Sequence, residues 1–361
     1  MKSSLLLART TIRRSGGMVI KVSLYVISLL MCMTVMTKAG GAADFYEGKT
    51  IKLVVASGAG SGVDILGRLV ARHLRKHIPG EPLIIVQNIP KPTAVGGANY
   101  VYNVAKPDGL TIGGASAGLF SRSLSHPGVR FDLNKFTWLA NMYNATVILW
   151  ARTDFPCPTL EQLAKCQKTL QFGATSKGST GYGLVPELVK EALGLNMKIT
   201  YGYVSREIPA AVARGELDAS GGDLIGFFGG PTLSMMKEGK VRILLQVASD
   251  KSPVLASYNV PWVMDVISEK YQKLFSMINP IIDLARPYYA PPGIPEESKE
   301  ILREAFRRLG SDEEFKAEVK RAARTEVSVI VGEKMIKAIK QMLDQPPEIK
   351  DKIIQLLKGG K

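Results

Sequence analysis

The sequence predicts an α/β protein, and three observations support that fold class. Short β-rich runs alternate with segments of helical periodicity, an order typical of mostly parallel sheets that are covered by helices. Hydrophobic residues make up 46% of the chain and charged residues 22%, a composition that excludes an intrinsically disordered protein. The length of 361 residues is sufficient for two folding units, so we expect two domains or lobes.

The first 43 residues have the composition of a secretory signal peptide. They contain six basic residues and no acidic residue, and an apolar run at 22–36 precedes the small residues of 39–43. A basic start, a short apolar core and small residues at the end are the order of a signal peptide. The apolar run is short for a bilayer, which requires about 20 residues. We expect cleavage near Ala43, with an uncleaved membrane anchor as the alternative.

The chain that follows the signal peptide is moderately basic. Without residues 1–43 it holds 41 basic and 32 acidic residues, which gives a net charge of +9. The basic residues are scattered, and nucleic-acid binding would require a clustered basic face. A modest positive field suits anionic small molecules, although it is also compatible with a simple basic surface.

Cysteine and histidine are scarce, which argues against zinc sites and disulfide scaffolds. The chain has three of each. His73 and His77 share the spacing of metal ligands on a helix, but position 74 is leucine where a zinc peptidase has glutamate. Cys157 and Cys166 could form a disulfide in an oxidising compartment, or they could be two buried thiols.

The first predicted strand and helix are joined by a loop of small residues. Residues 50–56 form a β-rich run that ends at the glycine- and serine-rich segment 57–62. A helix follows, because apolar side chains recur at the spacing of one stripe, and Asp64 in its first turn complements the helix dipole. The stripe consists of Leu66, Leu69, Val70 and Leu74.

The same alternation continues along the chain until its C-terminal part, where amphipathic helices predominate. Further strands are predicted at 83–86, 110–113, 147–151, 170–172, 198–203, 217–220 and 241–247. Further helices are predicted at 96–104, 160–168, 183–193, 208–214, 296–309, 312–324 and 332–343.

Two motifs resemble those of enzymes but lack a required residue. The loop 58–62 lies between a strand and a helix, yet Val63 stands where a dinucleotide fingerprint has its third glycine. The segment 114–118 has the spacing of a nucleophile elbow around Ser116, but only His126 follows it, too early in the chain to serve as the base. Both loops instead present small polar groups and backbone amides.

A series of weak motifs together resembles one protein family. These motifs follow the family's order and spacing over residues 45–330, so the whole series is more specific than any single motif in it. The motifs lie at 48–68, 85–90, 96–99, 105–112, 172–179, 203–211, 215–218, 239–242 and 289–295. In these segments the chain resembles the tripartite tricarboxylate transporter substrate-binding proteins, also called Bug-type receptors. It departs from them in lacking prolines in the first loop and in having Tyr203-Val204-Ser205 where the family has tyrosine-lysine-glycine.

The resemblance implies a fold like that of type II periplasmic binding proteins, with two α/β lobes joined by a two-crossing hinge. The first lobe would comprise residues 44–143 and 253–361 and the second 144–252, with crossings near 141–147 and 249–254. The family consists of periplasmic receptors that capture a small organic anion, a mono-, di- or tricarboxylate, and deliver it to membrane permease subunits. We therefore expect a monomeric, non-catalytic protein in the periplasm, with no cofactor, metal or nucleic-acid partner.

Loops at helix starts form the predicted ligand site, because amide and hydroxyl donors at helix N-termini hold carboxylates without a formal cation. Arg206 could add a bidentate contact or be a solvated surface residue, and Asp64 could contact ligand or only cap its own helix. The predicted ligand-binding residues are Ser57, Gly58, Gly60, Ser61, Asp64, Ser116, Ser176, Gly178, Ser179, Thr180, Tyr203, Ser205, Arg206 and Asp223.

Two alternatives to a transport receptor stay open. One is a hydrolase or nucleotide-linked enzyme, which the lack of a histidine-containing constellation disfavours. The other is a periplasmic sensor that docks on a signalling kinase. A single sequence does not separate a sensor from a transport receptor.

Overall fold

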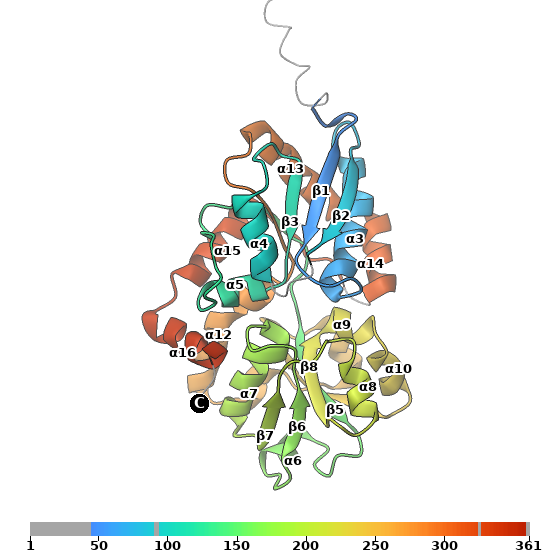
Figure 1. Ribbon diagram of the computed structural model, residues 1–361. Coiled ribbons are helices and arrows are strands. Elements are labelled where there is room, and N and C mark those ends of the chain that lie inside the picture. Colours follow the sequence, from blue (N-terminus) through green and yellow to red (C-terminus); the bar gives the residue numbers. More distant parts are fainter. Residues whose placement is uncertain (1–44, 90–93, 324–325, 359–361) are drawn as a thin grey trace, which may run out of the picture.

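The protein has two α/β lobes, stacked along its long axis (Figure 1). The structure is a computed structural model that describes residues 45–89, 94–323 and 326–358. The predicted signal peptide lies outside the described residues. Within them, no helix combines the length and the apolar character needed to cross a membrane. Each lobe is built on a sheet of its own.

The first lobe has a six-stranded sheet in the order β11-β4-β10-β3-β1-β2. Its strands are β1 (Thr50–Val55), β2 (Leu83–Asn88), β3 (Thr111–Gly114), β4 (Thr137–Asn141), β10 (Pro287–Ala290) and β11 (Ile330–Val331). Its helices are α3 (Gly62–Leu74), η2 (Arg75–His77), α4 (Ala94–Asn103), α5 (Gly118–Ser123), α13 (Glu296–Leu309), α14 (Glu313–Ala323) and α15 (Glu333–Leu343).

The second lobe has a five-stranded sheet in the order β7-β6-β8-β5-β9. Its strands are β5 (Val147–Arg152), β6 (Leu170–Gly173), β7 (Met197–Thr200), β8 (Ala219–Asp223) and β9 (Val241–Val247). Around it lie α6 (Leu160–Ala164), η3 (Thr180–Leu184), α7 (Val185–Leu193), α8 (Ile208–Ala213), α9 (Leu224–Phe228), α10 (Thr232–Lys237), η4 (Pro253–Tyr258) and α11 (Val263–Val266).

Both sheets are mixed, which corrects the expectation of mostly parallel pairing. β1 pairs in parallel with β2 and β3, but β10 runs antiparallel to β3 and β4. In the second sheet β6 pairs in parallel with β7 and β8, while β5 runs antiparallel to β8 and β9. β11 is also reversed, because it pairs antiparallel with β4. β5 and β10 are the reversed strands that the chain forms directly after it crosses from the other lobe. Each therefore enters its sheet from the side of the cleft.

The predicted apolar stripe of α3 is buried in the first lobe. Leu66, Leu69, Val70 and Leu74 are at most 5% exposed. They face β1 and β2 on one side and contact α13 and α14 on the other. Ser61 begins the helix, because its side chain accepts a hydrogen bond from the amide of Asp64 at 3.2 Å. This packing fixes the start of α3 at the edge of the first sheet.

The two faces of β5 belong to two separate apolar clusters. Val147 and Leu149 contribute to the large core that extends through both lobes. Ile148 and Trp150 point to the opposite face, as alternation along a strand requires, and pack with Ile208 of α8. This smaller cluster lies between the second sheet and the helices α8 and α9.

The chain crosses between the sheets at two neighbouring segments. The first crossing, 142–146, matches the predicted one and joins β4 to β5. The second lies at 284–286, after α12 (Glu269–Asp283), which corrects the expected position at 249–254. The two crossings are hydrogen bonded, since the amide of Met142 donates to Arg286 at 3.1 Å and that of Arg286 donates to Asn141 at 2.9 Å.

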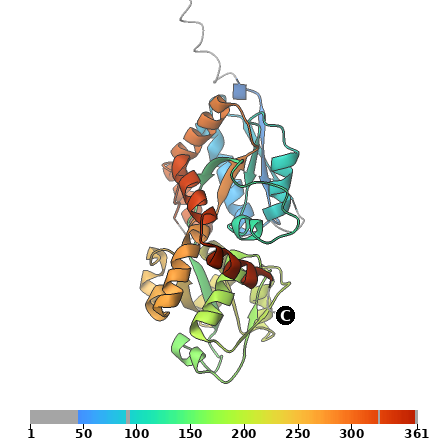
Figure 2. The same ribbon diagram turned by 90° about the vertical axis from the view of Figure 1, so that its left-hand side faces the viewer.

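Residues 253–266 remain with the second sheet, which explains the late second crossing. Leu255 is buried in the smaller cluster of that lobe, and Trp262 forms a β-bridge with Gln246 of β9. The predicted boundaries of the two lobes themselves stay predictions. The C-terminal helix α16 (Pro347–Lys358) lies across the level where the lobes meet (Figure 2). It contacts α5 of the first lobe and η3 of the second.

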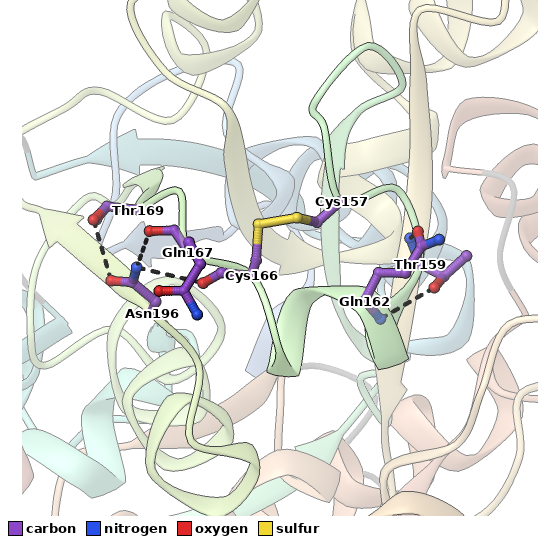
Figure 3. Close-up of a disulfide and its surroundings, with 7 residues drawn as sticks. All are labelled: Cys157, Thr159, Gln162, Cys166, Gln167, Thr169 and Asn196. Atoms are coloured by element: carbon purple, nitrogen blue, oxygen red, sulfur yellow. Dashed lines mark hydrogen bonds between the residues drawn. A yellow bond between two sulfur atoms is a disulfide. The ribbon is translucent and has the colours of Figure 1, made fainter.

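A disulfide joins Cys157 to Cys166 and encloses α6 (Figure 3). Their Cα atoms are 6.1 Å apart. A reciprocal cap starts the helix, because Thr159 and Gln162 each accept a hydrogen bond from the other's backbone amide. Asn196 ties the far end of the loop to β7 by donating to the carbonyl of Gln167 at 2.9 Å. Of the two alternatives open from the sequence, the structure has the disulfide.

A candidate ligand site between the lobes

A cleft of about 380 Å³ lies between the two lobes, and we call it the interlobe cleft. Both lobes and both crossings contribute to its lining. The first lobe and the second crossing supply residues from 60–65, 116–118 and 282–286. The second lobe supplies residues from 145–150, 179–182, 205–209 and 221–232.

Eight of the predicted ligand-binding residues line this cleft, and six do not. Those that line it are Gly60, Ser61, Ser116, Ser179, Thr180, Ser205, Arg206 and Asp223. Those outside its lining are Ser57, Gly58, Asp64, Ser176, Gly178 and Tyr203. The structure thus brings residues from several predicted loops to one cavity. The other six predicted residues lie outside the lining of that cavity.

Asp64 stabilises the first loop and does not face the cleft. It is 2% exposed and accepts hydrogen bonds from the Gly60 amide at 2.8 Å, Arg68 at 3.0 Å and Asn88 at 2.8 Å. Burial alone would raise the pKa of this carboxyl, but the hydrogen bonds from Arg68, Gly60 and Asn88 together lower it. These contacts fit the second role open from the sequence, in which Asp64 orders its own helix start.

The predicted loop residues Ser176 and Gly178 connect the lobes at the side of the cleft. Arg122 of α5 donates to the Ser176 hydroxyl at 2.6 Å, and Ser121 donates to the carbonyl of Gly178 at 3.0 Å. Tyr203 points elsewhere, because its hydroxyl hydrogen bonds to Glu216 at 2.7 Å. Ser176 and Gly178 therefore join the lobes without lining the cleft, and Tyr203 also lies outside its lining.

An ion pair between Asp223 and Arg286 crosses the floor of the interlobe cleft. Asp223 ends β8 and caps α9 by accepting from the Gly226 amide at 2.9 Å, while Arg286 belongs to the second crossing. Arg286 is 5% exposed. Burial would lower the pKa of its guanidinium, but the carboxylate of Asp223 raises it, so Arg286 stays charged.

Two buried donors that line the cleft lack a hydrogen-bond partner among the described residues. They are the hydroxyl of Thr180, which is 6% exposed, and the Nε–H of Arg286. A buried donor without a partner costs free energy, and such groups are rare outside functional sites. The Nε–H of Arg286 can only donate, and the hydroxyl of Thr180 can donate as well as accept, so both can bind a group that accepts hydrogen bonds.

Two glycines near the ion pair allow close packing around it. A Cβ atom at Gly62 would lie 3.2 Å from the guanidinium of Arg286. Gly222 has a φ of +141°, which side chains rarely adopt, and a Cβ there would lie 2.9 Å from the hydroxyl of Tyr182. Burial and the nearby Asp223 raise the pKa of Tyr182, so this hydroxyl stays protonated.

Sequence reasoning missed Arg286 and Tyr182, which both line the cleft. Tyr182 follows the predicted Ser179–Thr180 pair at the start of a helix, so extending that motif by one turn would have found it. Arg286 carries no comparable signal, because it is 63 positions from Asp223 in the sequence. Only the crossing of the chain brings the two together.

Comparison with known families agrees with the fold and with the resemblance seen in the sequence. The sequence model of the tripartite tricarboxylate transporter family receptor matches residues 66–345. The chain belongs to this receptor family. Among curated relatives, a UPF0065 protein of Bordetella pertussis is 29% identical over 172 residues, 46% of this chain and 52% of the relative. One from Agrobacterium vitis is 25% identical over 180 residues, 48% of this chain and 50% of the relative. The chain thus matches about half the length of each of these curated relatives.

Solved structures of similar fold cover the receptor more fully. The periplasmic binding protein BugD has a TM-score of 0.66 at 18% identity, over 85% of this chain and 97% of its own. The MatC protein of Rhodopseudomonas palustris, with bound malate, has a TM-score of 0.64 at 19% identity, over 86% and 99%. Another R. palustris protein, with adipate, has a TM-score of 0.67 at 18% identity, over 85% and 97%. At these identities the likeness supports the two-lobed fold.

Proposed function

We propose that this protein is a periplasmic receptor that captures a small organic carboxylate in the interlobe cleft and delivers it to a tripartite tricarboxylate-type permease. The observation that carries the proposal is the pair of unpartnered buried donors, Thr180 and Arg286, which line one cavity from the second lobe and the second crossing. A carboxylate accepts hydrogen bonds from both and is favoured near the N-terminus of α3. The malate and adipate bound by the two R. palustris proteins of the same fold are consistent with this ligand class.

A non-catalytic role is supported by the positions of the histidines. Ser116 lines the cleft, but no histidine does so among the described residues. His73 hydrogen bonds to Glu318 of α14, and His77 to Asp312, the residue before that helix. His126 accepts a hydrogen bond from the amide of Gly128 at 3.0 Å. A serine nucleophile requires an adjacent base, and none of these imidazoles is available for that role.

Location in the periplasm is supported by two independent features. The first 43 residues have the order of a secretory signal peptide. The disulfide between Cys157 and Cys166 belongs to an oxidising compartment. The permease as partner rests on membership of the receptor family.

Thermal unfolding with a panel of carboxylates tests the proposed function. The mature protein, residues 44–361, is heated alone and with mono-, di- and tricarboxylates. A bound carboxylate stabilises the folded state by about 2.7 kcal/mol at a hundredfold excess over Kd. A panel in which every carboxylate leaves the melting temperature unchanged would contradict the proposal, as would detection of a chemical product.

A variant that fills the cleft shows whether the stabilisation arises there. Gly226 lines the cleft, and a Cβ atom at this position would make only ordinary contacts with Asp223 and Tyr182. We expect Gly226→Leu to abolish the ligand-induced shift while the ligand-free protein melts nearly as before. The control is Ala210→Leu on α8, an exposed helical site outside the lining. A full shift in Gly226→Leu would place the ligand elsewhere.

A further inference from the structure

Part of the interlobe cleft is an apolar chamber inside the second lobe. We define this chamber by Ile148 and Trp150 of β5, Ile208 of α8 and Phe227 of α9, all of which line the cleft. Each of the four is at most 4% exposed, and the rings of Trp150 and Phe227 meet edge to face with centroids 6.0 Å apart. The cleft therefore continues from its polar loops into a space with apolar and aromatic walls.

The charges along the cleft leave room for one anionic group. Only three charged side chains line it among the described residues: Arg206, Asp223 and Arg286. Asp223 and Arg286 neutralise each other, and Arg206 is exposed. A second carboxylate in the chamber would lose its hydration without meeting a cation, which disfavours its binding.

The single anionic group has a defined place in the cleft. Thr180 and Arg286 supply the two unpartnered donors, and Gly60 and Ser61 place the N-terminus of α3 at the same cavity. α3 has 13 residues, so its dipole favours a negative charge there. Every one of these groups lies among the polar residues of the cleft, and none belongs to the chamber.

We propose that the ligand is a monocarboxylate with an aromatic or branched alkyl body, which the cleft selects over di- and tricarboxylates. This inference rests on the proposed function and names the ligand class of the same site. The carboxylate binds at Thr180 and Arg286, and the body lies in the chamber against Trp150 and Phe227. Aromatic rings favour an aromatic or alkyl partner there, because such contacts bury apolar area in an offset or edge-to-face arrangement.

Isothermal titration calorimetry with four probes tests this selectivity. The probes are 3-phenylpropanoate, 4-methylpentanoate, succinate and citrate, titrated into the mature protein. We expect the two monocarboxylates to bind at least about tenfold more tightly than succinate and citrate. Tighter binding of succinate or citrate would overturn the inference and leave the proposed function intact. Absence of binding by all four, together with a thermal panel that shows no shift, would overturn both.

Two neighbouring phenylalanines of α9 provide matched variants. Phe227 lines the chamber, whereas Phe228 lines a different cavity that also includes Met236 and Tyr258. The two side chains are 4% and 5% exposed, so the same substitution removes comparable packing. We expect Phe227→Leu to weaken 3-phenylpropanoate binding about tenfold and Phe228→Leu to leave it within about twofold.

A second chamber variant keeps the test valid if Phe227→Leu does not fold, as judged by circular dichroism. Ile148→Val removes one methylene from the chamber wall and keeps the β-branched shape that suits β5. It is expected to weaken 3-phenylpropanoate more than succinate. Equal effects on both probes, or equal effects of Phe227→Leu and Phe228→Leu, would overturn the inference.

Discussion

Arg286 differs from Arg206, the other cation of the interlobe cleft, because it is buried and paired with Asp223 of the second lobe. Lysine at this position would keep a positive charge for Asp223 but would lose the Nε–H that has no partner among the described residues. We expect Arg286→Lys to weaken the best-binding carboxylate about tenfold or more, the effect of one hydrogen bond to a charged group. The measurement is calorimetric Kd. Arg130→Lys, at an exposed site outside the lining of the cleft, is the control, and equal losses in both variants would contradict the role of Arg286.

At the level of single residues, local motifs were predictable and contacts between distant residues were not. Ser179 and Thr180 stand at a helix start in the sequence, and both line the cleft. Asp64 also stands at a helix start, but its side chain is satisfied by Gly60, Arg68 and Asn88. Nothing in the sequence distinguishes these two outcomes, because Asn88 reaches Asp64 only after β1 and β2 pair.

Among helices, the contact between α3 and α14 gives a pH-dependent contribution to stability. Glu318 of α14 binds Arg72 and His73 of α3, and the hydrogen bond from His73 lowers the pKa of Glu318 below its ordinary value of 4.5. A carboxyl with a lowered pKa stabilises the fold fully above its unfolded-state pKa. That stabilisation is lost as the pH falls through the folded-state pKa. The contribution is therefore present at neutral pH and disappears below about pH 4.5.

Glu318→Gln tests this contribution through the melting temperature measured between about pH 6 and pH 3.5. We expect the variant to melt a few degrees lower at neutral pH and to lose less stability on acidification than the unchanged protein. Glu313→Gln on the same helix is the control, because Glu313 is exposed and pairs with Lys316 of its own helix, not with α3. Parallel pH profiles of the unchanged protein and Glu318→Gln would contradict the prediction.

Helices with a long apolar stripe were predictable, and so were short strands such as β3 and β6, whereas β4, β10 and β11 were not. α3 was expected from four apolar positions, all of which are buried. β10 is four residues long and starts with Pro287, a residue that weakens any strand signal. It forms a strand because it inserts between β3 and β4 after the second crossing. That insertion depends on the arrangement of the whole first lobe.

In the molecule as a whole, contacts on three sides hold the lobes around the cleft. Arg286 binds Asp223 at the floor, and Arg122 binds Ser176 at one side. α16 spans the lobes, with Lys352 bound to Glu191 of α7 at 2.6 Å. The resemblance predicted two lobes but not these contacts, because none of the contacting residues belongs to the motifs that carried it, except the loop around Ser176.

Removing the contact at the side should favour opening of the lobes. The guanidinium of Arg122 is partly buried against the second lobe and donates to Ser176 at 2.6 Å, so Arg122→Ala removes a bond that exists only when the lobes meet. Closure of two lobes is a hinge motion whose equilibrium such differential contacts set. We expect the ligand-free variant to have a larger radius of gyration by small-angle X-ray scattering than the unchanged protein. Saturation with ligand should restore the compact value, because the proposed carboxylate lies between Thr180 of the second lobe and the N-terminus of α3 in the first lobe.

Arg130→Ala, at an exposed site of the first lobe, is the control for this prediction. Identical scattering of the Arg122 and Arg130 variants would show that the bond to Ser176 does not restrain opening.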